Sequence, residues 1–274
     1  MRRTLKLCTI LTFAFLYIPI LVLVVASFNA GHDIAQFQGF TLYNYGELFE
    51  DKFLLLLLRN SFIMAIVSAV LATAIGTLAA IGIQAMAPRV RSAVMSVTNI
   101  PLTNPDIVTG VSLALLFSFV GLLLKRQDAM LGFATLLIAH VTFNLPYVIL
   151  SVLPKLRQMD PSLRDAALDL GCRPYQAFFK VTIFEILPGI ISGFIMAFTM
   201  SLDDFVISYF VYGPKFITLP VEIYTQTKKP LHPKIYALFT LMFFAMLLLM
   251  IIMNLLQSRD EKRRRNRIFP LGAR

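Results

Sequence analysis

The sequence predicts an all-α integral membrane protein with six transmembrane helices. Of its 274 residues, 58% are hydrophobic and 15% are charged, whereas soluble domains average about 25% charged residues. The apolar residues gather into six segments, each of roughly the 17–25 residues that a helix needs to cross a bilayer. Backbone polar groups inside lipid must be satisfied within the segment itself, so each segment is expected to be a helix.

The six segments are expected to form a single transmembrane domain over residues 1–274. The first follows Arg2, Arg3 and Lys6. Its apolar run of about 22 residues exceeds the roughly 7–15 of a cleavable signal peptide, so we expect it to be retained. Before the second segment, Leu54 to Leu58 are expected to form an interfacial helix. In chain order the segments occupy residues 7–28, 61–86, 97–124, 131–153, 186–211 and 235–257.

The third segment contains a predicted break. Pro101, Pro105 and Gly110 interrupt the helical pattern, and Asp106 stands among them. Proline lacks an amide proton and frees a carbonyl of the preceding turn, and broken helices at membrane depth often line a cavity. Two interpretations stay open: Asp106 faces a cation path, or it lies near the membrane surface and caps the following helix.

Polar residues of the fourth and fifth segments need partners inside the bundle. His140 and Asn144 are four positions apart and share a helix face, which predicts hydrogen bonds to a neighbouring helix. Asp203 and Asp204 are costly in lipid, at about 2.5–3.5 kcal/mol each on insertion scales. They therefore require water, a cation or a polar neighbour.

A polar stripe along the fifth segment indicates which acid faces a path. On a continuous helix Asp204 lies on the stripe, and Asp203 is turned about 100° away from it. We therefore expect Asp204 to face the path and Asp203 to face a neighbouring helix. The alternative is that both acids only hold helices together. Tyr209 and Tyr212 offer aromatic faces that attract cations, or they are ordinary interfacial tyrosines. The stripe comprises Ala197, Ser201, Asp204, Ser208 and Tyr212.

Residues 154–185, between the fourth and fifth segments, predict a helical hairpin outside the membrane. Asp160 is an expected N-cap with Pro161 at the first helical position. Gly171 is expected to end this helix with a positive φ. A second short helix is expected over residues 173–180.

The distribution of basic residues predicts the orientation. With both termini on the same side, most of the 25 Lys and Arg residues lie on that side, in the hairpin and in a basic tail over residues 258–274. By the positive-inside rule this side is the cytoplasm. The net charge of +10 is therefore interpreted as a topology signal rather than as a nucleic-acid-binding surface.

The sequence contains no pattern typical of a catalytic or nucleotide-binding site. The motifs GxxxxGK[ST], HExxH and GxSxG are all missing. Cys8 and Cys172 are far apart and belong to no Cys/His cluster. We expect a chain that is not an enzyme, with no catalytic residues, metal or cofactor of its own, so that any ATP hydrolysis belongs to another subunit.

The hairpin resembles the EAA loop of permease subunits of binding-protein-dependent ABC importers. The triplet that begins at Asp165 is followed, after three residues, by Gly171, as in the family pattern of Glu-Ala-Ala, three residues and Gly. Asp165 replaces the family's Glu, and Phe184 stands where the family has Pro. The resemblance implies the six-helix fold of type I importer permeases, in which this cytoplasmic hairpin is the coupling helix. The coupling residues would be Asp165, Ala166, Ala167, Asp169 and Gly171.

Further motifs are similar to those of the spermidine/putrescine subgroup, especially its second permease subunit. They include Asn104 to Val108 and Ser201 to Phe205. This resemblance implies a multi-pass subunit of a polyamine importer in the bacterial inner membrane, working by alternating access. Its partners would be a homologous second permease, two ATPase subunits that bind ATP and Mg, and an external polyamine-binding protein. The substrate path would include Ser201, Asp203, Asp204, Asp106, Tyr209 and Tyr212.

Two alternatives stay open. One is the same kind of importer for iron, sulfate or molybdate, although an anion permease would have little use for an acid pair. The other is an ion-coupled secondary transporter that uses these acids as a proton relay, which the EAA-like hairpin argues against. The sequence does not distinguish spermidine from putrescine.

Overall fold

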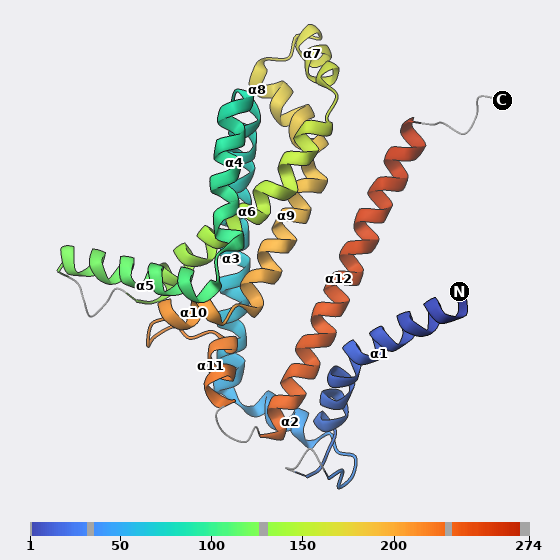
Figure 1. Ribbon diagram of the computed structural model, residues 1–274, viewed down its shortest axis with the longest axis vertical. Helices are drawn as coiled ribbons and strands as arrows, with labels where there is room; N and C mark the ends of the chain where they lie inside the picture. The colour runs from blue at the N-terminus through green and yellow to red at the C-terminus, as the bar shows by residue number, and fades with distance from the viewer. Residues whose placement is uncertain (1, 32–35, 126–130, 228–231, 269–274) are drawn as a thin grey trace. The chain divides into compact units, whose positions relative to one another are not determined.

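The computed structural model describes residues 2–31, 36–125, 131–227 and 232–268, and this range is almost entirely helical (Figure 1). Five described helices are long and apolar enough to cross a membrane, and a shorter apolar helix covers Pro233–Leu248. The predicted all-helical membrane fold is confirmed.

Residues 269–274 of the expected basic tail lie outside the described residues. The elements are α1 (Arg2–Ser27), α2 (Tyr43–Glu50), α3 (Lys52–Ala85), α4 (Pro88–Thr103), α5 (Asp106–Leu123), α6 (Phe133–Gln158), α7 (Pro161–Asp169), α8 (Pro174–Ala177), the π-helical turn η2 (Phe178–Thr182), α9 (Ile183–Asp203), α10 (Val206–Val211), α11 (Leu219–Gln226) and α12 (Pro233–Ile268).

The chain divides into two compact units, Met1–Leu55 with Gln226–Arg274 and Leu56–Thr225. In the first unit, α12 packs against both α1 and α2. Lys234 in the first turn of α12 donates a hydrogen bond of 2.9 Å to Asp51 and lies 3.5 Å from Glu47. These ion pairs hold the C-terminal end of α2 against the start of α12.

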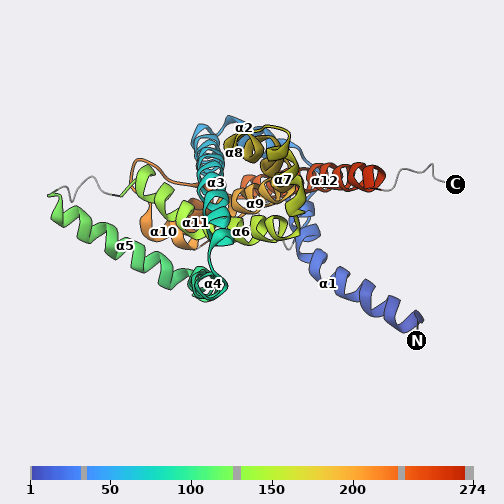
Figure 2. The ribbon, with the colours of Figure 1, turned by 90° about the horizontal axis from the view of Figure 1, so that it is seen from above.

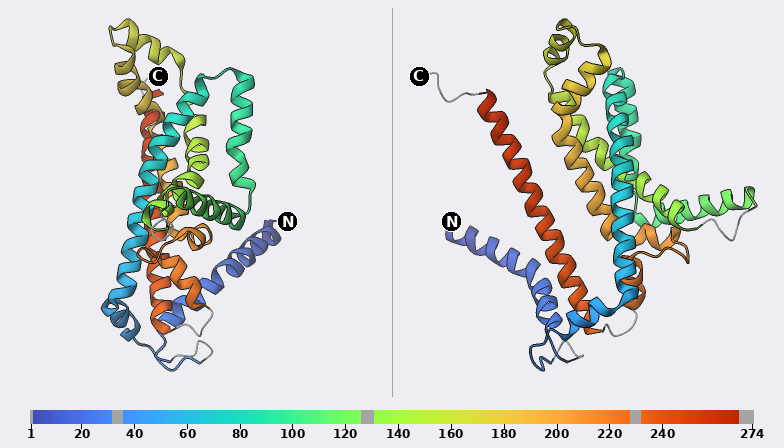
Figure 3. Two further views of the ribbon diagram at one scale, coloured as in Figure 1. Left: turned by 90° about the vertical axis from the view of Figure 1, so that its left-hand side faces the viewer. Right: turned by 180° about the vertical axis from the view of Figure 1, so that it is seen from behind.

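The second unit is built around the packing of α6 against α9 (Figures 1 and 3). Gly189 and Gly193 of α9 let the two backbones approach closely. A Cβ atom at Gly189 would lie 2.9 Å from the carbonyl oxygen of Ser151 on α6. Small residues at such contacts are typical of helices that associate in membranes.

The expected third span, residues 97–124, is two helices in the structure. α4 ends at Thr103, Asn104 is extended with ψ of 135°, and α5 begins at Asp106. Figure 2 shows α5 turning away from the axis of α4 at this point. The break falls at Pro105, which removes an amide donor as predicted. Pro101 lies inside α4 and does not end it.

Gly110, the third expected interruption, is a packing position within α5. A Cβ atom there would lie 2.8 Å from the Phe210 ring of α10. The close contact of α5 with α10 contributes to a hydrophobic core of the second unit. Its buried members are Met64, Phe117, Leu136, Ala139, Ile207 and Val211.

The expected fifth span, residues 186–211, also differs from the structure. A helical segment runs without a gap from Pro174 to Asp203 through α8, η2 and α9. The second helix expected for the hairpin, residues 173–180, is thus the first part of this long helix. At the other end Asp204 is extended, with ψ of 119°, and α10 follows as a separate helix. The interfacial helix expected at residues 54–58 is likewise part of the longer α3.

Candidate functional site

The break between α9 and α10 is stabilised by the carboxylate of Asp204. Its Oδ1 accepts a hydrogen bond from the amide of Ile207 at 3.2 Å. Its Oδ2 accepts one from the amide of Ser208 at 2.8 Å and one from the Ser208 hydroxyl at 2.7 Å. The side chain therefore caps α10 and satisfies amides that have no partner in the first turn of a helix.

His140 of α6 extends this arrangement on the α10 side of the break. Its Nε2 lies 2.9 Å from the Ser208 hydroxyl and 3.6 Å from Oδ2 of Asp204. The single Ser208 hydroxyl proton is donated to Asp204, so Nε2 of His140 is the donor to Ser208. The His140 side chain is fully buried, and its Nδ1 has no hydrogen-bond partner among the described residues.

Asn144, one turn along α6, holds the α9 side of the break. Its Nδ2 donates a hydrogen bond of 2.7 Å to the hydroxyl of Ser201. Ser68 of α3 lies 2.8 Å from the same hydroxyl. The prediction that His140 and Asn144 make hydrogen bonds between helices is confirmed. We call these side chains the polar cluster: Ser68, His140, Asn144, Ser201, Asp204 and Ser208.

The structure places the side chains of the two acids differently from the expectation. Asp204 was expected to face an open path, but its side chain is only 10% exposed and is bound within the polar cluster. Asp203 was expected to face a neighbouring helix, but it is exposed. The polar stripe assumed a continuous helix, and the extended backbone at Asp204 breaks it. Ser201 is likewise buried and hydrogen-bonded.

Aromatic rings lie on the α10 side of the same break. The ring centroids of Phe205 and Tyr224 are 4.9 Å apart, those of Tyr209 and Tyr224 5.6 Å, and those of Tyr209 and Tyr212 6.2 Å. We call these four residues the aromatic group. Tyr209 and Tyr212 were expected near Asp203. Tyr224 was missed, because it comes from α11 and no spacing in the sequence brings it to α10.

Asp106 is the exposed first residue of α5. An acid in the first turn of a helix is stabilised by the helix dipole. Across the break, Asn104 donates a hydrogen bond of 3.1 Å to the hydroxyl of Thr109. Because the helix that Asp106 begins packs on α10, both helix breaks belong to one packed part of the second unit.

The hairpin between α6 and α9 has the predicted caps. Asp160 accepts a hydrogen bond of 3.0 Å from the amide of Ser162, and the pKa of Asp160 is lowered by this bond. Gly171 has φ of +83°. The amide of Cys172 donates to the carbonyl of Ala167 at 3.1 Å, which closes the end of α7.

The EAA-like residues lie mostly on the surface of this hairpin. Asp165, Ala166, Asp169 and Gly171 are exposed, whereas Ala167 is buried. On the same hairpin Leu163, Leu170 and Tyr175 are also exposed, Leu170 to 87%. Several exposed apolar side chains rimmed by polar residues are typical of a contact with another protein.

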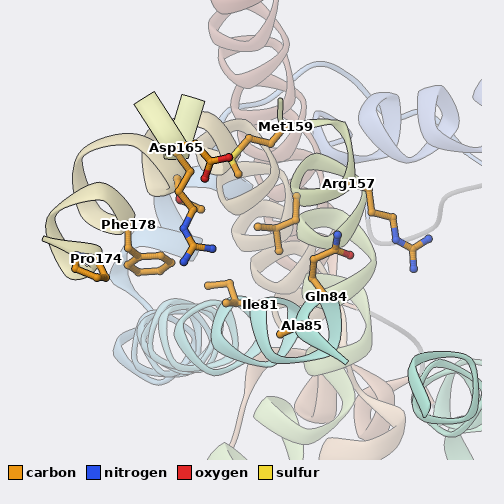
Figure 4. A pocket seen from close by; sticks show the side chains of 11 residues that line it. Ile81, Gln84, Ala85, Arg157, Met159, Asp165, Pro174 and Phe178 are labelled. Atoms are coloured by element: carbon orange, nitrogen blue, oxygen red, sulfur yellow. The ribbon is translucent and has the colours of Figure 1, made fainter. Parts of the chain in front are cut away.

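A pocket of about 540 Å³ lies between the hairpin and the ends of α3 and α6 (Figure 4). Asp165, Pro174 and Phe178 line it from the hairpin, and Ile81 and Ala85 line it from α3. The pocket thus connects the EAA-like triplet to two of the long helices.

Among the described residues, no three His, Cys, Asp or Glu side chains gather closely enough to hold a metal ion.

Comparison with known proteins identifies relatives over most of the chain. Residues 72–266 match the family described as binding-protein-dependent transport system inner membrane component. The spermidine/putrescine transport system permease protein PotC of Escherichia coli (strain K12) is 36% identical over 249 residues, which cover 91% of each chain. The putrescine transport system permease protein PotI of the same strain is 38% identical over 256 residues, which cover 93% of this chain and 91% of PotI.

Two solved structures share the fold at low sequence identity. A bacterial ABC transporter that imports the acidic polysaccharide alginate superposes with a TM-score of 0.72 at 16% identity and covers 94% of both chains. An amino acid ABC transporter superposes with a TM-score of 0.50 at 18% identity, covering 81% of this chain and 96% of the other. These likenesses concern the fold.

Proposed function

The chain belongs to the family of binding-protein-dependent transport system inner membrane components, and from this premise we propose that it is the transmembrane permease subunit of an ATP-driven polyamine importer. The observation that carries the polyamine assignment is the identity of 36–38% with two polyamine permeases over more than nine tenths of the chain. These relatives do not favour the alternative of an importer for iron, sulfate or molybdate.

The chemistry of the α9–α10 break fits a flexible polycation. Asp203 presents an exposed carboxylate, and the rings of Phe205 and Tyr224 are partly exposed on the other side of Asp204. An ammonium group is attracted both by a carboxylate and by aromatic faces, the latter by about 0.5–2 kcal/mol each. Asp106 on the adjoining α5 is a second exposed carboxylate for a cation that has several charges.

The hairpin would transmit the work of a separate ATPase. It presents Asp165, Ala166 and Asp169 at the surface, and its second half continues into α9 without a gap. A push on the hairpin would thus move α9 and the break at its end as one body. Movement of packed helices as rigid bodies is the ordinary form of such transitions.

The complete transporter would contain a homologous second permease, two ATP-binding subunits and an external polyamine-binding protein. ATP and Mg would be bound by the ATPase subunits. Both termini and the hairpin would face the cytoplasm of a bacterial cell, as the distribution of Lys and Arg indicates.

The test is uptake of labelled spermidine and putrescine by proteoliposomes that contain the complete complex. Asp203→Asn is expected to raise KM about tenfold, because a charge-assisted contact of about 1.5 kcal/mol is lost. Asp203→Glu keeps the charge and is the matched control, with a smaller effect. An unchanged KM in Asp203→Asn would remove Asp203 from the path. ATP-independent uptake by the chain alone, driven by a proton gradient, would favour the secondary transporter instead.

A further inference from the structure

We propose that Asp204 is a positioning residue, which fixes the angle between α9 and α10 and does not bind the transported cation. The inference rests on the proposed function, since the polyamine site beside the break is the one that Asp204 would hold in place. It assigns to the two adjacent acids, Asp203 and Asp204, roles opposite to those expected from the sequence.

The carboxylate of Asp204 is already used within the protein. Both of its oxygens accept hydrogen bonds, at 3.2 Å from the Ile207 amide and at 2.8 and 2.7 Å from the Ser208 amide and hydroxyl. Its side chain is 10% exposed, and buried His140 lies 3.6 Å away. A cation that bound Asp204 would have to displace these donors, and the amides would then lose their partner in a water-poor interior.

One turn of α6 holds both sides of the break. His140 contacts Ser208 on α10, and Asn144 contacts Ser201 on α9. Four residues of helix span about 6 Å, so the two contacts lie close together on a single rigid element. The angle between α9 and α10 is therefore determined by α6 and Asp204.

The angle between α9 and α10 sets the distance between the Asp203 carboxylate and the aromatic rings. Asp203 is the last residue of α9, Phe205 immediately precedes α10, and Tyr209 lies on α10. Asp203 has no bond to the polar cluster and is exposed. Fixing Asp204 thus places the exposed Asp203 carboxylate at the end of α9 and the aromatic group on the α10 side of the break.

The experiment compares Asp204→Asn, Asp204→Ala and Asp203→Asn in the complete complex. Asparagine keeps one acceptor oxygen for the amides of α10 but carries no charge and loses the second acceptor, whereas alanine has neither an acceptor nor a charge. Uptake gives KM and the maximal rate. Independently, spin labels at Met196 on α9 and at exposed Lys215 beyond α10 report the angle, with Cys8 and Cys172 replaced by serine.

We expect Asp204→Asn, which loses one of the two acceptor oxygens, to broaden the distance distribution less than Asp204→Ala does and to keep a KM within about threefold of the parent complex. Asp204→Ala is expected to broaden the distribution and to lower the maximal rate about tenfold. Asp203→Asn is expected to raise KM about tenfold with an unchanged distribution.

Two results would overturn the inference. A KM in Asp204→Asn raised as much as in Asp203→Asn would show that the Asp204 charge binds the cation. A narrow distribution in Asp204→Ala would show that Asp204 does not fix the angle. If the parent complex imports no polyamine, the proposed function fails, while the spin-label distances still decide whether Asp204 positions α10.

Discussion

Replacing Gly171 by valine tests whether the hairpin is the coupling element. Gly171 has φ of +83°, and the hydrogen bond from the Cys172 amide to Ala167 depends on the chain turning there. A Cβ atom at this position would meet no other heavy atom within 4 Å. The cost of the substitution is therefore one of backbone conformation and not of a clash with neighbours.

The expected cost follows from that conformation. A residue with a Cβ atom pays about 1–2 kcal/mol in the left-handed region, and a β-branched residue is among the least suited to it. A change of this size lowers the ratio of closed to open hairpin about 5- to 30-fold. Asparagine adopts the left-handed region more readily than other non-glycine residues, so Gly171→Asn is the matched control.

The assay is co-purification of the ATPase subunits and ATPase activity stimulated by the binding protein. Gly171→Val is expected to lose most of both, and Gly171→Asn is expected to keep most of both, with equal amounts of each variant in the membrane. Full coupling in Gly171→Val would refute the reasoning. So would equal defects in the two variants, since the predicted difference lies only in their tolerance of positive φ.

Two further predictions concern stability. Gly189→Ala is expected to destabilise the second unit by about 1–3 kcal/mol, because its Cβ atom would lie 2.9 Å from the Ser151 carbonyl oxygen. Gly82→Ala is the control, since a Cβ atom there would meet no atom within 4 Å. Equal Tm values of the two variants in detergent would contradict the packing argument. In the first unit, partial burial raises the pKa of Asp51, but hydrogen bonds from Lys234 and nearby amides outweigh burial and lower it below 3.8. The ionised Asp51 therefore stabilises the folded protein at a pH above the pKa of Asp51 in the unfolded chain, and this stability is lost as the pH falls through the lowered pKa of the folded protein. Asp51→Asn should reduce the fall in Tm between pH 6 and about pH 3. An undiminished fall in Tm would argue against this contribution.

Local signals predicted much of the fold. Hydropathy located the apolar helices, Pro105 marked the break before α5, and Asp160 and Gly171 marked the ends of α7. Each of these features depends on chemistry within a few residues: a missing amide proton, a capping carboxylate, or a residue without a Cβ atom.

The break at Asp204 depends on distant residues and was not predicted. No proline or glycine lies between Asp203 and Val206 to mark it. The Asp204 carboxylate caps α10, and His140 of α6 contacts Ser208 at the same point. Periodicity assumes a continuous helix, so it placed Asp204 on an open face. Tyr224 was missed for the same reason, since α11 reaches α10 only through the fold.

The most direct measurement of the central claim is uptake of labelled spermidine or putrescine by proteoliposomes that contain this chain with its partner permease, ATPase subunits and binding protein. We predict uptake that requires ATP on the side of the ATPase subunits, requires the binding protein on the other side, and weakens with Asp203→Asn. Import of sulfate or molybdate without polyamine uptake, or polyamine uptake by this chain alone without ATP, would contradict the account.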